Sequence, residues 1–202
     1  MIEIKNMSKS FGDVKLFENY SLTITDGDFV IFSGVSGCGK TTLLNIIGSL
    51  ESVDSGEIIV DGNDITNKRN QLEYLRKKVG FLFQNFALVD NKTVLENLKL
   101  VKKDCRSGVE IDEALELVGL LDKKGRKVFS LSGGEQQRVA LARLMIKKYD
   151  YILADEPTGS LDRKNAETVF EILKKINCSG KTVVVVTHDE SLQIMGRRLI
   201  NL

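Results

Sequence analysis

The spacing of hydrophobic residues changes several times along the chain, and each spacing predicts either a strand or a helix. Apolar residues alternate with polar ones around Ile2 and Ile4 and again around Leu22 and Ile24. This period of two is typical of strands. A glycine turn at residues 26–28 then leads into the short apolar strand Phe29–Phe32. The first 34 residues are therefore predicted to be β structure.

A helical period appears after residue 40. Thr41–Leu50 places its apolar residues on one side of a helix. Strands are predicted at Glu57–Asp61 and Lys78–Phe83, with a helix at Asn70–Lys77 between them. From Thr93 to Lys148 apolar residues recur at three and four positions, which predicts a helical region.

Strands return near the end of the chain, at Tyr151–Ala154 and Thr182–Thr187, with a helix at Arg163–Ile176 between them. Val183–Val186 is apolar at every position, as in a central strand of a parallel sheet. The pattern predicts one α/β domain over residues 1–202. Its core lobe would cover about 1–84 and 149–202, and a helical lobe about 85–148.

Composition narrows the possible functions. The 202 residues are 42% hydrophobic and 28% charged, with a net charge of +1, as expected for one globular domain without a nucleic-acid partner. No apolar run approaches the roughly 20 residues that span a membrane. We therefore expect a soluble, cytosolic chain whose membrane role comes through a partner. Cys38, Cys105 and Cys178 are odd in number and lack metal-ligand spacing, which indicates reduced thiols.

The segment Gly34–Thr41 matches the phosphate-binding P-loop pattern, which ends in Gly-Lys-Thr. Its glycines let backbone N–H groups turn into one concavity, and the following helix adds its positive end. We expect Lys40 to reach the β- and γ-phosphates of a nucleotide and the Thr41 hydroxyl to bind Mg²⁺. An ordinary glycine-rich turn is the alternative, but the flanking strand and helix argue against it. The expected nucleotide contacts are Gly34, Val35, Ser36, Gly37, Cys38, Gly39, Lys40, Thr41 and Thr42.

Two carboxylates, Asp155 and Glu156, end the strand Tyr151–Ala154. Parallel sheets bind ligands at the carboxyl ends of their strands, so both are expected beside the P-loop. Asp155 would hold magnesium through water, and Glu156 would polarise the attacking water as general base. Many strands end in acidic residues, so this pattern indicates a nucleotide site only in combination with the P-loop.

Two further motifs each allow two interpretations. His188, the single histidine, follows the strand Thr182–Thr187 and either faces the nucleotide or begins a helix with Asp189 and Glu190. In Leu131–Arg138, Ser132 and Glu135 form the pattern of a capping box. That pattern indicates either an ordinary capped helix or a second phosphate-binding terminus, which would suit the ATP of another subunit.

Together these motifs resemble the ATP-binding cassette (ABC) ATPases, over essentially the whole chain and in the family order. Leu131–Gly134 is similar to the ABC signature, and Gly159–Ser160–Leu161–Asp162 to the D-loop. Gln84 resembles the Q-loop residue that contacts magnesium and senses a membrane partner. His188 resembles the switch histidine that contacts the γ-phosphate, and Phe11 the aromatic residue that stacks on adenine.

The resemblance implies a P-loop NTPase core with a mostly parallel sheet, N-terminal antiparallel strands and an inserted helical subdomain. It implies ATP hydrolysis with Mg²⁺ as cofactor. The implied catalytic residues are Glu156, His188 and Lys40; the implied metal ligands are Thr41, Gln84 and Asp155.

The resemblance also implies partners. Two copies would meet head to tail around two ATP, in a dimer that depends on the nucleotide. The residues implied to act on the other copy's ATP are Ser132, Gly133, Gly134, Glu135 and Asp162. An integral membrane permease on a separate chain would dock near Gln84, which places this chain on the cytoplasmic face of a membrane.

The sequence departs from the family pattern at a few positions. Glu135 stands where the signature commonly has Gln, and Val35 and Cys38 stand where the P-loop commonly has Pro and Ser. Thr41 replaces Ser but keeps the hydroxyl, and Phe11 replaces Tyr but keeps the ring face used in stacking. None of these changes removes a group that the ATPase chemistry requires.

The motif strings resemble one branch of the family, which includes macrolide and peptide exporters, lipoprotein-release ATPases and a cell-division ATPase. The small size is similar to ATPases of bacteriocin export, and with the sequence ending at Leu202 we expect no regulatory domain. We therefore expect export of a peptide, lipoprotein or antimicrobial. Three alternatives remain: a cell-division ATPase, a soluble ABC ATPase of DNA repair or translation, and a P-loop kinase. The kinase would leave Leu131–Arg138 unexplained.

Overall fold

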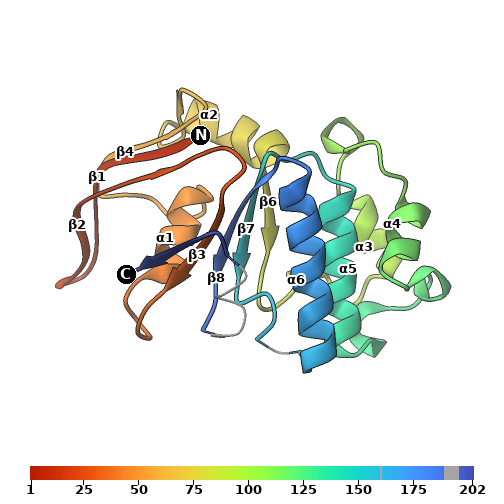
Figure 1. The fold of residues 1–202 in the computed structure, drawn as a ribbon. Helices are drawn as coiled ribbons and strands as arrows, with labels where there is room; N and C mark the ends of the chain where they lie inside the picture. The colour runs from red at the N-terminus through yellow and green to blue at the C-terminus, as the bar shows by residue number, and fades with distance from the viewer. Residues whose placement is uncertain (160, 189–195) are drawn as a thin grey trace.

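Two sheets and a set of helices build the protein, as the computed structural model in Figure 1 shows. The structure describes residues 1–159, 161–188 and 196–202, apart from the side chain of residue 164. Ser160 of the expected D-loop lies outside the described residues. So do Asp189 and Glu190, with which a helix after His188 was one expectation.

An antiparallel sheet of four strands, in the order β2-β1-β4-β5, forms the first layer. Its strands are β1 (Ile2–Phe11), β2 (Val14–Ile24), β4 (Ser55–Val60) and the two-residue β5 (Asn63–Asp64). The alternation at Ile2 and Ile4 points these side chains into the core, where both are buried. The expectation of antiparallel N-terminal strands is confirmed.

A parallel sheet in the order β6-β7-β8-β3-β9 forms the centre of the molecule. Its strands are β3 (Phe29–Ser33), β6 (Val79–Leu82), β7 (Tyr151–Asp155), β8 (Thr182–Val186) and β9 (Arg198–Asn201). The apolar strands are buried on both faces and separate two clusters of core residues. In β8, for example, Val183 and Val185 pack into one cluster and Val184 and Val186 into the other.

The two faces of this sheet carry different helices. Helix α1 (Lys40–Ile47) lies between the two sheets, and α5 (Gly133–Met145) and α6 (Arg163–Cys178) lie side by side on the opposite face (Figure 1). The other α-helices of the described residues are α2 (Lys68–Glu73), α3 (Val94–Lys99) and α4 (Ile111–Leu117). Short 3₁₀ turns occupy Lys103–Cys105, Leu121–Lys123 and Val128–Ser130.

The structure corrects the sequence prediction in a few places. The helix expected at Asn70–Lys77 is α2 followed by a π-helical turn, Tyr74–Lys78, in which the buried Tyr74 hydroxyl donates to Ile47 O at 2.9 Å. Leu100 and Leu117 belong to the helical periodicity of residues 93–148, which predicts that they lie on apolar helix faces, but both are exposed. Within the part of the chain that the structure describes, none of the helices has the length and apolar character needed to span a membrane.

Candidate nucleotide-binding site

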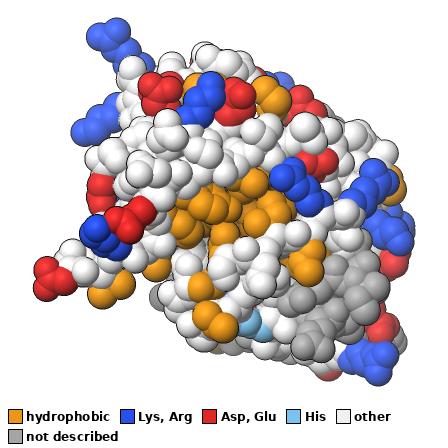
Figure 2. Space-filling view, turned by 60° about the vertical axis from the view of Figure 1, so that its left-hand side comes forward, with side chains coloured by type: hydrophobic (Ala, Val, Ile, Leu, Met, Phe, Trp, Pro, Cys, Tyr) orange, Lys and Arg blue, Asp and Glu red, His pale blue; other side chains and the backbone are white. Residues whose placement is uncertain are grey.

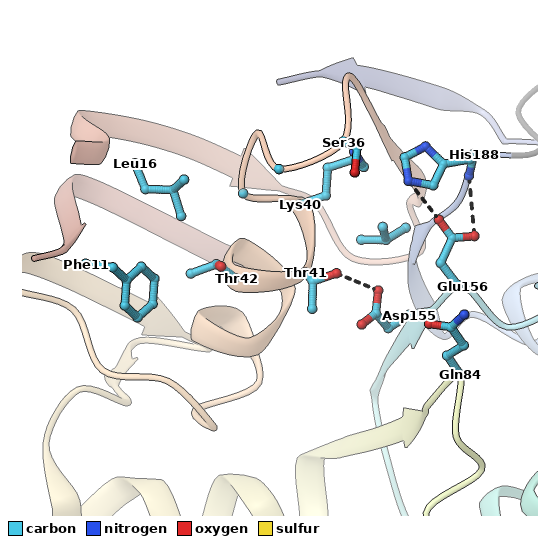
Figure 3. A pocket seen from close by; sticks show the side chains of 13 residues that line it. Phe11, Leu16, Ser36, Lys40, Thr41, Thr42, Gln84, Asp155, Glu156 and His188 are labelled. Atoms are coloured by element: carbon cyan, nitrogen blue, oxygen red, sulfur yellow. Dashed lines mark hydrogen bonds and ion pairs between the residues drawn. The ribbon is translucent and has the colours of Figure 1, made fainter. Parts of the chain in front are cut away.

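A long cavity of about 610 Å³ lies where the carboxyl ends of β3, β6, β7 and β8 meet. Figure 3 shows Phe11 and Leu16 at one end, and Glu156, His188 and Gln84 at the other. His188 is visible at the molecular surface in Figure 2, below a hollow in which hydrophobic side chains gather. The lining residues are Phe11, Leu16, Ser36, Gly37, Gly39, Lys40, Thr41, Thr42, Gln84, Asp155, Glu156, Val186 and His188.

The P-loop forms the middle of the cavity, between β3 and α1. Gly39 is the N-cap of α1 with a φ of 102°, and an added Cβ would lie 2.8 Å from the Phe17 ring and 2.9 Å from Leu16. Only glycine suits this position, because the backbone is left-handed and β2 packs directly against it. The Lys40 side chain is buried and donates to Gly34 O at 2.9 Å and Val35 O at 2.8 Å.

A hydrogen bond joins the P-loop helix to the end of β7. The Thr41 hydroxyl donates to Asp155 Oδ1 at 3.0 Å. Burial raises the pKa of Asp155, while the Thr41 hydrogen bond and the Lys40 ammonium act in the opposite direction. The Thr41 hydroxyl, the Asp155 carboxylate and the Gln84 amide all line the cavity and offer the oxygen ligands that Mg²⁺ prefers.

Glu156 and His188 face each other at the far end of the cavity. His188 Nε2 lies 3.4 Å from Glu156 Oε1, and the His188 backbone N–H donates to Oε2 at 3.4 Å. Glu156 Oε1 is buried, and no described residue donates a hydrogen bond to it. Glu156 also has a φ of 43°, an uncommon conformation for a residue with a side chain. Its carboxylate oxygen therefore remains available to a molecule in the cavity.

Phe11 ends β1, and its exposed ring lines the opposite end of the cavity from Glu156. The Lys9 ammonium lies 4.8 Å from the ring centroid and is itself buried, with Glu51 Oε1 at 2.7 Å. Phe11 lines the cavity and Lys9 does not. An exposed aromatic face at this position is suited to stacking on a base.

The structure brings together most of the predicted P-loop residues, but not all. Gly34, Val35 and Cys38 do not line the cavity. Cys38 is half-buried, with its Sγ 3.6 Å from the Lys40 ammonium. Leu16 and Val186 line the cavity and were not predicted, because each belongs to a strand whose pattern indicates only a packing role.

The residues expected to act in trans lie away from this cavity. Ser132 is the N-cap of α5, and the predicted capping box with Glu135 is present. Asp162 is the N-cap of α6, and its carboxylate accepts hydrogen bonds from the Asn165 backbone and side-chain amides at 2.9 and 2.6 Å. An added Cβ on Gly134 would meet the Asn165 side chain at 3.0 Å, so the first turns of α5 and α6 are neighbours.

Comparison with known proteins supports the resemblance to ABC ATPases. A family model described as "ABC transporter" matches residues 17–159. The lipoprotein-releasing system ATP-binding protein LolD of Porphyromonas gingivalis is 38% identical, with 100% of this chain and 96% of that protein covered. The macrolide export ATP-binding/permease protein MacB of Campylobacter jejuni is 39% identical, and this chain spans about a third (33%) of its length.

Solved structures give the same result for the fold. The dimeric ATP-binding cassette MJ0796 in a post-hydrolysis state with ADP and Pi has a TM-score of 0.88 and 39% identity, covering 100% of this chain and 94% of that one. The family model covers more than half of the chain, and the LolD alignment runs along nearly the full length of both proteins. This chain is a member of the ABC transporter family.

Proposed function

We propose that this chain binds and hydrolyses ATP and that the hydrolysis drives a separate membrane-embedded partner. The observation that carries this proposal is the arrangement of one cavity. It combines a P-loop, a buried carboxylate oxygen without a donor among the described residues, and a stacking ring at the opposite end. The adenine would stack on Phe11, the phosphates would lie on the P-loop, and the γ-phosphate would lie near Glu156 and His188.

Mg²⁺ fits the side chains at the phosphate end of the cavity. The described residues contain no group of three or more His, Cys, Asp or Glu that could hold a metal ion, so few protein ligands would contribute. The proposed ligands are Thr41, Asp155 and Gln84, and the ion would neutralise charge on the β- and γ-phosphates. Phosphate oxygens and water would supply the other oxygen ligands.

The protein side chains divide the chemistry among them. Glu156 Oε1 accepts a proton from the attacking water, which it also orients. Lys40 stabilises negative charge on the transferred phosphoryl group. Two P-loop carbonyls accept hydrogen bonds from its ammonium and hold it in position. His188 lies close enough to Glu156 to orient its carboxylate and contact the γ-phosphate.

The sandwich dimer follows from the position of the α5 terminus. Ser132, Gly133 and Gly134 begin a helix of 13 residues outside the chain's own cavity, so they would bind the phosphate of a second copy's ATP. Glu135 and Asp162 lie beside this terminus and belong to the same proposed surface toward the second copy. The γ-phosphate then joins the copies, and its hydrolysis releases them.

The membrane partner is supported by a groove beside the Q-loop segment. Leu72, Leu75, Leu100 and Val101 line a groove of about 480 Å³. Arg143 also lines it and donates to Phe86 O at 2.9 Å and to Ala87 O, just after Gln84. Phe86 and Ala87 both have positive φ values, an uncommon and strained backbone conformation for residues with side chains. A permease segment in the groove would sense the nucleotide through Arg143 and this segment, with the chain at the cytoplasmic membrane face.

Export is the favoured role for the complex, because the relatives named above serve macrolide export and lipoprotein release. The cargo would be a peptide, lipoprotein or antimicrobial. A cell-division ATPase of the same branch is the second candidate, since it would use the same site and the same groove. A soluble ATPase of DNA repair or translation would leave the apolar groove without a use.

The test is capture of the partner from detergent-solubilised native membranes with Glu156→Gln and ATP, which hold the closed state. We expect one integral membrane protein to co-purify with ATP and to be lost in Leu72→Asp. Leu117→Asp, a leucine of similar exposure outside the groove, is the matched control. A soluble protein or nucleic acid in place of the membrane protein would contradict the transporter role and leave the ATPase unaffected.

A further inference from the structure

Glu135 places a carboxylate at the third position of α5, where the resemblance predicts a neutral glutamine. Glu135 Oε2 accepts the Ser132 backbone N–H at 2.8 Å, and the Glu135 N–H donates to Ser132 Oγ at 3.3 Å. These two bonds hold the carboxylate at the first turn of the helix. It therefore lies beside the Gly133 and Gly134 amides, which the proposed function assigns to phosphate binding.

A bare carboxylate at this place opposes that function. The positive end of a helix attracts phosphate because it carries a partial positive charge, and a full negative charge in the same turn cancels it. ATP carries several negative charges, so its attraction to this terminus would fall. The terminus therefore needs a compensating cation.

Lys123 supplies this cation. Its ammonium forms an ion pair with Glu135 Oε1, the oxygen that does not take part in the capping box. The backbone of Lys123 is fixed in a 3₁₀ turn, with its N–H donating to Leu120 O at 3.0 Å and its carbonyl accepting Arg126 N–H at 2.8 Å. The Lys123 ammonium lowers the pKa of Glu135, so the carboxylate remains charged and paired at neutral pH.

We propose that Lys123 is a positioning residue of the ATP-binding surface, which neutralises Glu135 so that the α5 terminus can accept the phosphate of a second copy's ATP. This inference rests on the proposed function, because it concerns the same sandwich dimer. Lys123 does not line the cavity of its own chain, so its effect is on dimer formation and not on nucleotide binding by the monomer.

The chain provides a matched control in the next residue. Lys124 forms an ion pair with Asp112 at 2.5 Å, away from the first turn of α5, and its side chain is as exposed as that of Lys123 (34% and 35%). Replacing Lys124 therefore removes one charge and one ion pair from the same segment without changing Glu135.

The experiment measures the ATP concentration that half-dimerises the Glu156→Gln protein, by light scattering. We expect Lys123→Met to raise this concentration about tenfold, because two negative groups then face each other. Lys123→Arg and Lys124→Met should leave it within about twofold. ATP affinity of the dilute monomer should be the same in all variants. Circular dichroism checks folding, and Lys123→Gln replaces Lys123→Met if the latter does not fold.

The decisive variant combines Lys123→Met with Glu135→Gln. With a neutral side chain at position 135 the compensating charge has nothing to neutralise, so we expect the double variant to dimerise like the Glu135→Gln protein. An unchanged midpoint for Lys123→Met, or an equal loss with and without Glu135→Gln, would overturn the role of Lys123 and leave the sandwich dimer standing. A Glu156→Gln protein that stays monomeric in saturating ATP would overturn the dimer and this inference together.

Discussion

The Thr41 hydroxyl donates a hydrogen bond to Asp155 Oδ1 at 3.0 Å, across 114 residues of sequence. It joins the first turn of α1 to the end of β7, so the two proposed magnesium ligands are in contact in the folded chain. One belongs to the P-loop motif and the other to the strand that ends in two acids. The two motifs are far apart in the sequence, and this contact shows that they belong to the same site.

Removal of the Thr41 hydroxyl should therefore lower magnesium-dependent hydrolysis. We expect Thr41→Ala to reduce phosphate release at least about tenfold, because a metal ligand is lost. Thr41→Ser keeps the hydroxyl and should remain within a few-fold of the parent. Phosphate release measured against Mg²⁺ concentration checks both, and an active Thr41→Ala protein with an unshifted Mg²⁺ dependence would exclude Thr41 as a ligand.

Phe11 should determine affinity for the base and not for the phosphates. Stacking on an aromatic ring contributes about 1–3 kcal/mol per base, so Phe11→Ala should weaken ATP binding by about fivefold or more. Phe11→Tyr keeps the ring and should bind ATP as the parent does. Competition by inorganic tripolyphosphate, which has no base, is the control and should not change. A loss of tripolyphosphate binding in Phe11→Ala would indicate a general distortion of the site.

Cys38 should make nucleotide binding sensitive to thiol reagents. Its Sγ lies 3.6 Å from the Lys40 ammonium, so an alkyl group added there would displace the loop and the lysine. We expect N-ethylmaleimide to abolish ATP binding and ATP to protect the thiol.

Cys38→Ser is the matched control, since Cys105 and Cys178 remain in it. This variant should bind ATP after the same treatment. Unchanged nucleotide affinity in the parent after complete modification of Cys38 would refute the prediction.

Asp150 should stabilise the fold in a pH-dependent way. Burial would raise the pKa of Asp150, but Lys78 at 2.9 Å and Lys181 at 3.0 Å lower it below its usual value. A lowered folded-state pKa adds stability above the unfolded pKa of about 3.9, and this stability is lost as pH falls through the folded value.

We therefore expect Asp150→Asn to lower the free energy of unfolding by about 0.5–1 kcal/mol at pH 7, a small value because the carboxylate is 44% exposed. The difference from the parent should shrink as pH falls below about 4. Urea unfolding at several pH values checks this. A difference that stays constant down to pH 2 would mean that the ion pairs are not its source.

The strands and the site motifs could be predicted because local pattern determines them. Val183–Val186 is apolar at every position, and the structure buries it on both faces as the core strand next to β3. The capping box of Ser132 and Glu135 could be predicted because both partners lie within one helical turn.

Contacts between distant segments could not be predicted in this way. Leu16 reaches the P-loop only because β2 packs against Gly39, and no period in the sequence encodes that approach. The π-helical turn at Tyr74–Lys78 adds a residue to one turn of the helix, where the Tyr74 hydroxyl bonds to the end of α1. The pairing of Lys123 with Glu135 depends on a 3₁₀ turn that has no clear sequence signal.

Whether ATP joins two copies of the chain can be measured as the mass of the Glu156→Gln protein in solution, by light scattering, with MgATP and with MgADP. Without the carboxylate that accepts the proton of water, the protein should bind ATP and hydrolyse it poorly, so the sandwich should accumulate. We predict twice the monomer mass with MgATP and the monomer mass with MgADP. A monomer at saturating MgATP would contradict the account.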